Sequence, residues 1–551
     1  MKKVIKLLSI FIVIIIFSNI SSVFADYLDV PKFTGTFVQP WLYKNWDEQR
    51  AENEFKRMNE LGIDTLIMGD TAIKDDKWTI EYPSKIDDFN NANFKSDNVK
   101  YLLDLCKKYK IKLYLGIGMD KTWNTSVADL TTKEGQQWFE QSMEISVKMV
   151  KELYDLYKKD YNDVFCGYYF VYEIFNNKQW NDEIKRKEIV KTLSNGFNFI
   201  INRINQIDKN MPLIFSTFST NDQNFATKEN TQKFYTEFIS ATNFRKVDVI
   251  SPMDNCGGGG QTINSLDEWT TVYYNAVKFN NDKLLLWSNC ESFIQPSNLE
   301  SGSWTTAPLN RFIKQLEITS KYSSKIISFS YPHYMSPYNT ISGFDKAYEN
   351  YLKTGKIDTT PPSIIKRVKT EIIDDSLVVR WTPAEDEFDI AQYKISKLNS
   401  YSKQFDLYAE NLVGREDGKG LELNTLLKCS FIDKYYNKKS KNVYIIEAMD
   451  CSGNFSEKAY IVVDGTNPIN NIDLNKNDGN KGFYTAEEYA NLNLILDENS
   501  QNDENSENNI NVYMISACVV LIAITAAVLS ALATLLSKKK KINVNNKQDT
   551  V

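Results

Sequence analysis

Short apolar runs alternate with amphipathic stretches along residues 26–357. Eight of the runs have the length and apolar content of buried strands. The predicted strands are Phe33–Gln39, Ile63–Gly69, Ile111–Ile117, Phe165–Glu173, Pro212–Phe218, Val247–Met253, Leu284–Glu291 and Ile326–Tyr331. The predicted helices between them are Trp46–Leu61, Asn98–Tyr109, Lys133–Lys159, Asn181–Asp208, Asn230–Asn243, Leu266–Asn280 and Pro308–Tyr322.

Strands that alternate with helices imply a parallel sheet, and eight such units favour a (β/α)₈ TIM barrel over residues 26–357. The nearest rival is an open doubly wound sheet, which would place a glycine-rich phosphate-binding turn after an early strand. The run Gly257–Gly260 follows the sixth predicted strand instead and opens no evident helix. We therefore predict the closed barrel.

The pattern changes after Asp358-Thr-Thr-Pro-Pro362. From there to residue 465, short strands without intervening helices predict a small all-β sandwich. The predicted strands are Leu377–Trp381, Gln392–Lys397, Val443–Met449 and Ala459–Val463. The Pro-Pro entry, Trp381 and the closing turn Asp450-Cys-Ser-Gly-Asn454 resemble a fibronectin type III module. This resemblance implies a two-sheet spacer domain.

Both ends of the chain predict export and membrane anchoring. Residues 1–25 combine a basic start, an apolar run and Val23-Phe24-Ala25, as in a secretory signal peptide; an uncleaved anchor is the alternative. Residues 512–537 are apolar and long enough to cross a membrane, and the lysines of the tail 538–551 favour a cytoplasmic C-terminus. The Asn- and Asp-rich residues 466–511 are the expected linker. We therefore expect a single-pass protein of the cell membrane with a large extracellular N-terminal part.

Charge and composition exclude several classes of function. The net charge is −6 and no basic stripe is present, so we expect no nucleic-acid partner. His333 is the only histidine, so a three-histidine zinc site cannot form, and no Gly-x-Ser-x-Gly motif is present for a serine hydrolase. We expect no metal in the active site and no cofactor. The seven cysteines show no close-spaced pair, and we interpret most of them as small buried hydrophobic residues.

One segment partly matches a calcium-binding loop. Asp473–Gly482 carries acidic and amide residues at alternate positions. An EF-hand loop that began at Asp473 would need glycine at Asp478 and glutamate at Tyr484. An Asn-rich turn explains the segment equally well, so calcium binding stays open.

Two glutamates end apolar strands at positions where barrel enzymes carry their active sites. Glu173 ends the fourth predicted strand, and Glu291 ends the seventh. Active sites of TIM barrels lie at the C-terminal ends of the strands, and these two strands lie across the mouth from each other. Two facing carboxylates are the groups that glycoside hydrolysis uses, one as acid and the other as nucleophile or base. The alternative for each glutamate is a structural ion pair with a rim arginine or lysine.

Other polar and aromatic residues fall at or just past predicted strand ends. Asp254 closes the sixth strand and could bind sugar hydroxyls or raise the pKa of a nearby glutamate. Aromatic rings at such positions can stack on sugars, although each one alone could equally be a core residue. The predicted substrate-binding residues are Trp41, Asp70, Trp123, Tyr172, Asp254, Asn255, Trp287, Asn289, Tyr331, His333 and Tyr334.

Glutamates at the ends of strands four and seven resemble those of the clan A glycoside hydrolases. The stretches Gly35–Trp41 and Met58–Ile67 also resemble a family of exported bacterial barrels that are labelled as glycosidases without a characterised activity. The resemblance covers residues 33–350. It implies a retaining hydrolase with Glu173 as acid/base and Glu291 as nucleophile. The chain departs from the clan by carrying Tyr172, instead of asparagine, before Glu173.

The leading hypothesis is therefore a glycoside hydrolase that cleaves an extracellular or cell-envelope polysaccharide. Two alternatives stay open. The barrel could bind or assemble a polysaccharide without catalysis; carboxyl groups far from about 5 Å apart, or an ion-paired Glu291, would favour this alternative. The chain could also be an adhesin in which the sandwich alone binds the ligand.

Overall fold

The computed structural model describes residues 27–295, 304–412, 427–476 and 479–492. The predicted signal peptide, the membrane span at 512–537 and the tail lie outside these ranges. Within them, no helix combines the length and the apolar content needed to cross a bilayer. The described cysteines form no disulfide.

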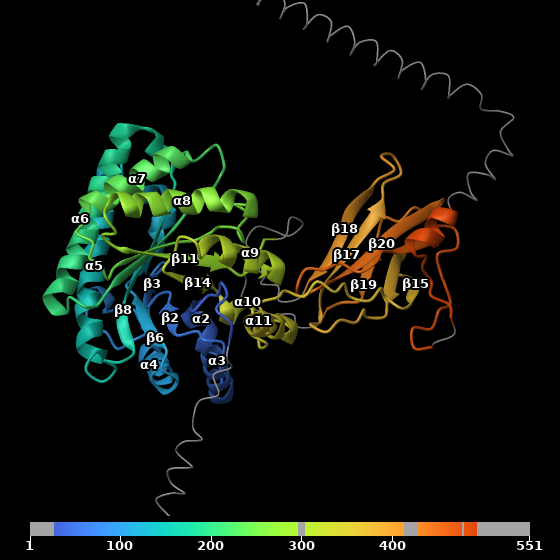
Figure 1. The fold of residues 1–551 in the computed structure, drawn as a ribbon, viewed down its shortest axis with the longest axis horizontal. Helices are drawn as coiled ribbons and strands as arrows, with labels where there is room; N and C mark the ends of the chain where they lie inside the picture. Colours follow the sequence, from blue (N-terminus) through green and yellow to red (C-terminus); the bar gives the residue numbers. More distant parts are fainter. Residues whose placement is uncertain (1–26, 296–303, 413–426, 477–478, 493–551) are drawn as a thin grey trace, which may run out of the picture. The chain divides into compact units, whose positions relative to one another are not determined.

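Eight parallel strands close into a barrel, and helices surround it (Figure 1). Each predicted barrel strand is confirmed to within two residues at either end, and the fourth runs two residues further than predicted, to Phe175. The barrel strands are β1 (Gly35–Val38), β2 (Thr65–Met68), β6 (Lys112–Gly116), β8 (Phe165–Phe175), β9 (Leu213–Phe218), β10 (Val249–Pro252), β11 (Leu285–Glu291) and β14 (Lys325–Phe329). Strand β1 pairs with both β2 and β14, so no edge is left open.

The predicted helices are also confirmed. The helices of the barrel domain are α2 (Pro40–Tyr43), α3 (Glu48–Glu60), α4 (Asn98–Tyr109), α5 (Lys133–Tyr157), α6 (Glu183–Ile207), α7 (Lys228–Ala241), α8 (Ile263–Phe279), α9 (Leu309–Thr319), α10 (Tyr331–Tyr334) and α11 (Ser342–Thr354). Side-chain caps fix several starts: Asp47 accepts the N–H of Arg50, and Thr132 accepts that of Gly135. Such caps satisfy amide groups that a helix end leaves open.

Short strands decorate the loops at the barrel mouth. One small sheet has the order β5 (Asn93–Phe94), β4 (Trp78–Ile80), β3 (Ala72–Lys74) and β7 (Met119–Asp120). A second pairs β12 (Phe293–Ile294) with β13 (Thr305–Thr306). Four 3₁₀ turns, η1 (Asp87–Phe89), η2 (Lys121–Asn124), η3 (Ser126–Ala128) and η4 (Lys178–Asn181), complete the described loops.

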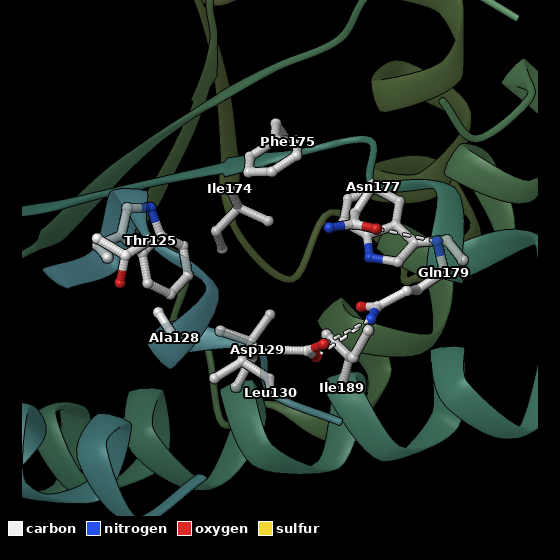
Figure 2. A pocket seen from close by; sticks show the side chains of 12 residues that line it. Thr125, Ala128, Asp129, Leu130, Ile174, Phe175, Asn177, Gln179 and Ile189 are labelled. Carbon is white, nitrogen blue, oxygen red and sulfur yellow. Dashed lines mark hydrogen bonds between the residues drawn. The ribbon is translucent and has the colours of Figure 1, made fainter. Parts of the chain in front are cut away.

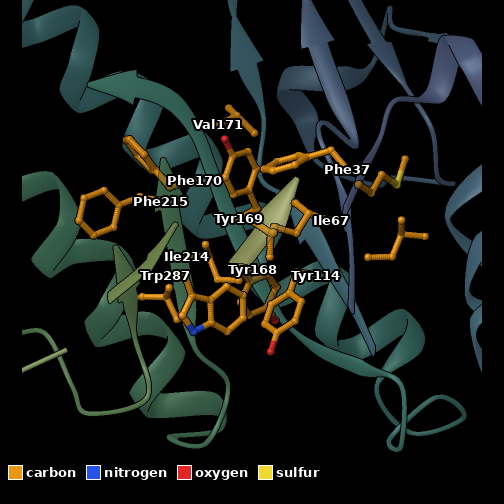
Figure 3. Close-up of a cluster of buried hydrophobic side chains, with 14 of the residues drawn as sticks. Phe37, Ile67, Tyr114, Tyr168, Tyr169, Phe170, Val171, Ile214, Phe215 and Trp287 are labelled. Atoms are coloured by element: carbon orange, nitrogen blue, oxygen red, sulfur yellow. The ribbon is translucent and has the colours of Figure 1, made fainter. Parts of the chain in front are cut away.

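Alternate residues of the barrel strands point inward. On β8, Tyr169 faces the interior and meets Phe37 of β1 at 5.3 Å between ring centroids. Its neighbour Phe170 faces outward and packs on Phe197 of α6 at 4.4 Å. Figure 3 shows this interior and also Trp287 beside Tyr114, whose rings lie 6.2 Å apart. The barrel is thus a packed core, with room for a site only at its mouth.

Residues 368–464 form two antiparallel sheets. One contains β15 (Val368–Ile373), β16 (Ser376–Trp381) and β19 (Ser430–Asp433). The other contains β18 (Phe405–Leu412), β17 (Ile390–Leu398), β20 (Lys441–Asp450) and β21 (Ala459–Asp464). Residues of both sheets share one apolar core, so the predicted sandwich forms.

Part of the expected linker packs against this sandwich. Phe483 joins its core and is 6% exposed, and the N–H of Val368 donates to the carbonyl of Lys481 at 2.8 Å. The apolar residues Ile472 and Phe483 explain this contact, because their burial stabilises the end of the segment on the sheet. The compact unit ends at Phe483.

Trp287 lies low in the barrel, at the level where β14 begins, because it pairs with Lys325. We expect Trp287→Ala to lower the free energy of unfolding of the barrel by about 3–5 kcal/mol, the usual range for removing a buried aromatic ring. Urea unfolding of the full-length chain measures this. The control Trp123→Ala removes a partly exposed ring at the mouth and should cost less. Equal losses would contradict the placement of Trp287 in the core.

Candidate active site

Two barrel strands, β8 and β11, deliver the predicted glutamates to the barrel mouth. Strands β9 and β10 separate them, so the two carboxylates approach from different sides of the opening. Inward alternation on β11 runs through Trp287, Asn289 and Glu291, and on β8 through Tyr169, Val171 and Glu173. Both glutamates line one cavity of about 360 Å³, which we call the carboxylate cavity.

Six of the predicted site residues, the two glutamates included, reach the same space. The predicted residues that line the carboxylate cavity are Trp41, Glu173, Asn255, Glu291, His333 and Tyr334. Phe293 and Trp304 complete an aromatic side, with ring centroids 5.1 Å apart. Apolar ring surface beside two carboxylates is a surface on which a sugar can both stack and donate hydrogen bonds.

Glu291 is held by backbone amides. Its side chain is 6% exposed, and Oε2 accepts the N–H of Gly257 at 2.6 Å and that of Gly258 at 3.0 Å. Glycine is required at 257, because a Cβ there would lie 2.6 Å from the carbonyl oxygen of Phe293 and 2.9 Å from Oε2 itself. The run of glycines after β10 is therefore a carboxylate cradle.

No basic side chain neutralises Glu291 within the described part of the chain. Arg311 is the nearest guanidinium that acts on it, but its Nη2 donates to the backbone carbonyl of Glu291 at 3.2 Å. Among the described residues, no ion pair of 4.0 Å or less involves Glu291 or Glu173. The structural ion pair that was the alternative for each glutamate is absent there.

Burial and a neighbouring charge raise the pKa of Glu291. Burial contributes most, followed by the negative charge of Asp254, whose Oδ1 accepts the N–H of Glu291 at 3.3 Å. The amides of Gly257 and Gly258 oppose this shift because they stabilise the ionised form. The sequence-based prediction that Asp254 raises the pKa of a glutamate agrees with this arrangement.

Glu173 stands free in the cavity. Among the described residues, no side chain or amide bonds to its carboxylate, and only its backbone oxygen is engaged, by the indole N–H of Trp123 at 3.0 Å. Water reaches the carboxylate through the cavity, yet protein atoms surround it, and this loss of solvation raises the pKa of Glu173 to about 7. A carboxyl of this kind holds its proton close to neutral pH.

A second cavity of about 240 Å³, the Asp70 cavity, continues from the first. The two share Gln39, Glu173, Met253 and Phe329. Three more predicted residues, Asp70, Trp123 and Asn289, line this second space. Glu173 therefore stands between two connected cavities.

A third cavity of about 230 Å³ shares Trp123 with the second (Figure 2). Figure 2 shows Asp129 facing Gln179, whose Nε2 donates to Oδ2 at 3.0 Å. Trp180 lies in its wall, stacked on Phe234. The space open to a ligand thus extends beyond the two carboxylates.

His333 is sealed into the wall of the carboxylate cavity. Its ring lies 5.3 Å from Trp41 and 5.4 Å from Phe329, and its Nδ1 shares a hydrogen bond with the hydroxyl of Ser330. Burial lowers the pKa of His333 to about 3, so the ring is neutral at physiological pH. It can position a ligand but cannot act as an acid there.

Tyr172 and Trp287 lie away from these cavities, contrary to our expectation for substrate-binding residues. Tyr172 points outward from β8, and its hydroxyl accepts the N–H of Asp120 at 3.1 Å. Trp287 lies deeper in the barrel core. Tyr172 points to the outer face of β8, and Trp287 lies near the start of β11, too low to reach the mouth.

Tyr331 and Asp254 also do not line the cavities. The hydroxyl of Tyr331 donates to Asp345 at 2.9 Å, which fixes the turn after β14 to α11. Asp254 is 5% exposed and accepts hydrogen bonds from Gln315 and from the N–H of Cys256 at 3.1 Å. Asp254 does not line the cavity, and its negative charge raises the pKa of Glu291.

The sequence did not reveal the part that Gly257 and Gly258 play. In the sequence, the run Gly257–Gly260 only argues against a phosphate-binding turn. Four glycines after a barrel strand also indicate a close backbone approach. Met253 and Phe329, which lie between the two cavities, carried no sequence signal beyond their apolar character.

One carboxylate group outside the barrel could accept a cation. Oxygens of Asp358, Asp386 and Asp450 lie within 4.8 Å of one another, the only such group among the described residues. Exposed acidic groups often lie this close without an ion. Residues 477–478 of the possible calcium loop lie outside the described ranges.

Residues 33–341 match the family described as "Domain of unknown function (DUF4434)". The chain belongs to this family. No protein of curated function matches the sequence.

Several solved structures are similar at low identity. One, from Bacteroides thetaiotaomicron VPI-5482, is described as a "putative alpha-L-fucosidase"; it is 21% identical with a TM-score of 0.47, over 60% of this chain and 96% of that one. Chitinase ChiA74 from Bacillus thuringiensis is 12% identical with a TM-score of 0.34, over 78% and 84% of the two chains. The intracellular xylanase TsXylA from Thermoanaerobacterium saccharolyticum is 11% identical with a TM-score of 0.33, over 56% and 87%. These similarities are too distant to bear on the chemistry of this family member.

The cradle around Glu291 predicts a specific sensitivity. We expect Gly257→Ala to destabilise the protein by about 1–3 kcal/mol, because the new methyl group must displace Phe293 or the carboxylate. The matched control is Gly69→Ala, whose Cβ would find its nearest neighbour at 3.4 Å. Thermal unfolding of both variants measures the difference. Equal melting temperatures would show that the cradle has room for a side chain.

Proposed function

We propose that this DUF4434 protein is a glycoside hydrolase that uses Glu173 and Glu291. The observation that carries the proposal is that both carboxylates line one cavity at the barrel mouth, with no basic partner among the described residues. A structural role would leave each glutamate paired. Instead, the carboxylate of Glu173 has no partner among the described residues, and that of Glu291 is held by two amides. The two environments differ, as those of an acid and a nucleophile do.

The two environments support a division of labour. Glu173 has a pKa near neutrality and no competing bond, so it can deliver a proton to the leaving glycosidic oxygen. Two N–H groups fix Glu291 and stabilise its ionised form against the burial that raises its pKa, so the ionised fraction can attack the anomeric carbon. Water then releases the glycosyl group, with Glu173 as base. This sequence retains the anomeric configuration.

The substrate under this proposal is a polysaccharide outside the cell. The predicted signal peptide and C-terminal span support an ectodomain tethered to the cell membrane. The sandwich of residues 368–464 would act as a fibronectin type III-like spacer between barrel and membrane.

A second candidate is a non-catalytic polysaccharide-binding protein. It is favoured by the raised pKa of Glu291, because a protonated Glu291 is a poor nucleophile. Hydrolysis distinguishes the two candidates, because a protein that only binds a polysaccharide would release no sugar from it.

We expect Glu173→Gln to lower hydrolysis of a cleavable glycan by about 10²–10⁴-fold, the usual contribution of a general acid. Glu291→Gln should abolish hydrolysis, since it removes the nucleophile. Release of reducing ends from a glycan panel by the full-length chain measures both, and NMR of the first product should show the retained anomer. The control Glu229→Gln changes an exposed carboxylate paired with Lys233. Normal rates in either active-site variant would remove that residue from the mechanism.

The pH profile should carry the signature of both groups. Glu173 must be protonated to act as an acid, so the rate should fall as the pH rises through about 7. Glu291 must be ionised, so the rate should also fall as the pH drops below its raised pKa. Removing the charge of Asp254 should lower that pKa. We therefore expect Asp254→Asn to move the acidic limb of kcat/KM to lower pH. An unmoved acidic limb would refute the coupling.

A further inference from the structure

Three hydrogen-bond acceptors in the Asp70 cavity have no partner among the described residues. The carboxylate of Asp70, at the end of β2, makes no hydrogen bond or ion pair there. Asn289 is 1% exposed, lines the same cavity and carries an unpartnered buried Oδ1. The free carboxylate of Glu173 is the third. Of the three, Asn289 is the buried one, and a buried acceptor is normally satisfied, so its Oδ1 indicates a missing donor.

The Asp70 cavity has no cation of its own. No lysine or arginine is among the residues that line it. Two lysines influence Asp70 from outside, but Lys44 lies 4.0 Å from Glu81 and Lys121 lies 2.5 Å from Asp75. Burial raises the pKa of Asp70 to about 6, which still leaves it ionised at neutral pH. The cavity therefore presents uncompensated negative charge.

Aromatic rings form much of the remaining wall. Phe37, Trp123, Tyr169 and Phe329 line the cavity together with the three acceptors. The faces of such rings attract cations as well as the apolar faces of sugars. A cavity with unpartnered acceptors, aromatic walls and negative charge favours a ligand that is cationic and rich in hydrogen-bond donors.

Resting on the proposed function, we propose that the Asp70 cavity is a subsite for a sugar that carries a protonated primary amine, as in a hexosamine without its N-acetyl group. An ammonium group offers three donors and no acceptor, and the Asp70 cavity offers acceptors and no basic side chain. N-acetylation removes both the charge and two of the donors. A uronic acid would bring a carboxylate against Asp70 and Glu173 and be repelled. The cavity adjoins the carboxylate cavity through Glu173, so this sugar is a neighbour of the one that is cleaved.

Binding of defined oligosaccharides to the full-length chain tests this assignment. The background carries Glu291→Gln, so that no ligand is consumed. The probes are glucosamine and galactosamine oligomers, their N-acetylated counterparts of equal length, and galacturonic acid oligomers, titrated by calorimetry in buffer just above the pKa of Asp70. We expect an amino oligomer to bind at least about tenfold more tightly than its N-acetylated counterpart.

Two added variants separate the subsite from general electrostatics. Asp70→Asn keeps the shape of the side chain and should erase the preference for the free amine. The control Glu229→Gln removes a carboxylate that is 77% exposed and paired with Lys233, and it should keep the preference. Equal affinity for amino and N-acetylated oligomers, tighter binding of the uronic acid oligomers, or a preference that survives Asp70→Asn would overturn the inference.

The subsite and the proposed reaction can fail separately. Hydrolysis of a glycan without any preference for the free amine would refute the subsite and leave the hydrolase intact. Amine-selective binding through Asp70, combined with hydrolysis of no glycan in the panel by the unmodified chain, would refute the hydrolase and leave the subsite.

Discussion

Closure of the parallel sheet is the constraint on which the rest of this structure depends. Once β1 pairs with both β2 and β14, each strand has one face toward the axis and one toward the helices. The inward residues fill the interior largely with apolar and aromatic side chains such as Trp287 and Tyr114. Glu173 and Glu291 lie above this packed interior, which explains how residues far apart in the chain come to line one cavity.

The sequence predicted the barrel well because periodicity and strand count are local signals. Each apolar run had turn residues on both sides, and the alternation with helices left few topologies. The two glutamates were predictable for a related reason: a single charge at the end of an apolar strand can be identified from the sequence alone.

The side-chain contacts at the mouth were less predictable. Tyr172 is adjacent to Glu173, yet the strand turns it to the opposite face, where it meets Asp120. Tyr331 looked like a subsite residue until α11 placed Asp345 against its hydroxyl. The amides of Gly257 and Gly258 could not be predicted either, because backbone groups carry no signature of the side chain that they will bind. Such contacts depend on tertiary packing between distant segments.

The cradle around Glu291 makes its two oxygens unequal. Oε2 is fixed by two N–H groups, whereas Oε1 has no bond to any described residue. Rotation of the carboxylate would break both bonds, so the plane of the carboxylate is fixed before any ligand arrives. Under the proposed reaction, the glycine backbone would therefore set the direction from which the carboxylate meets the sugar.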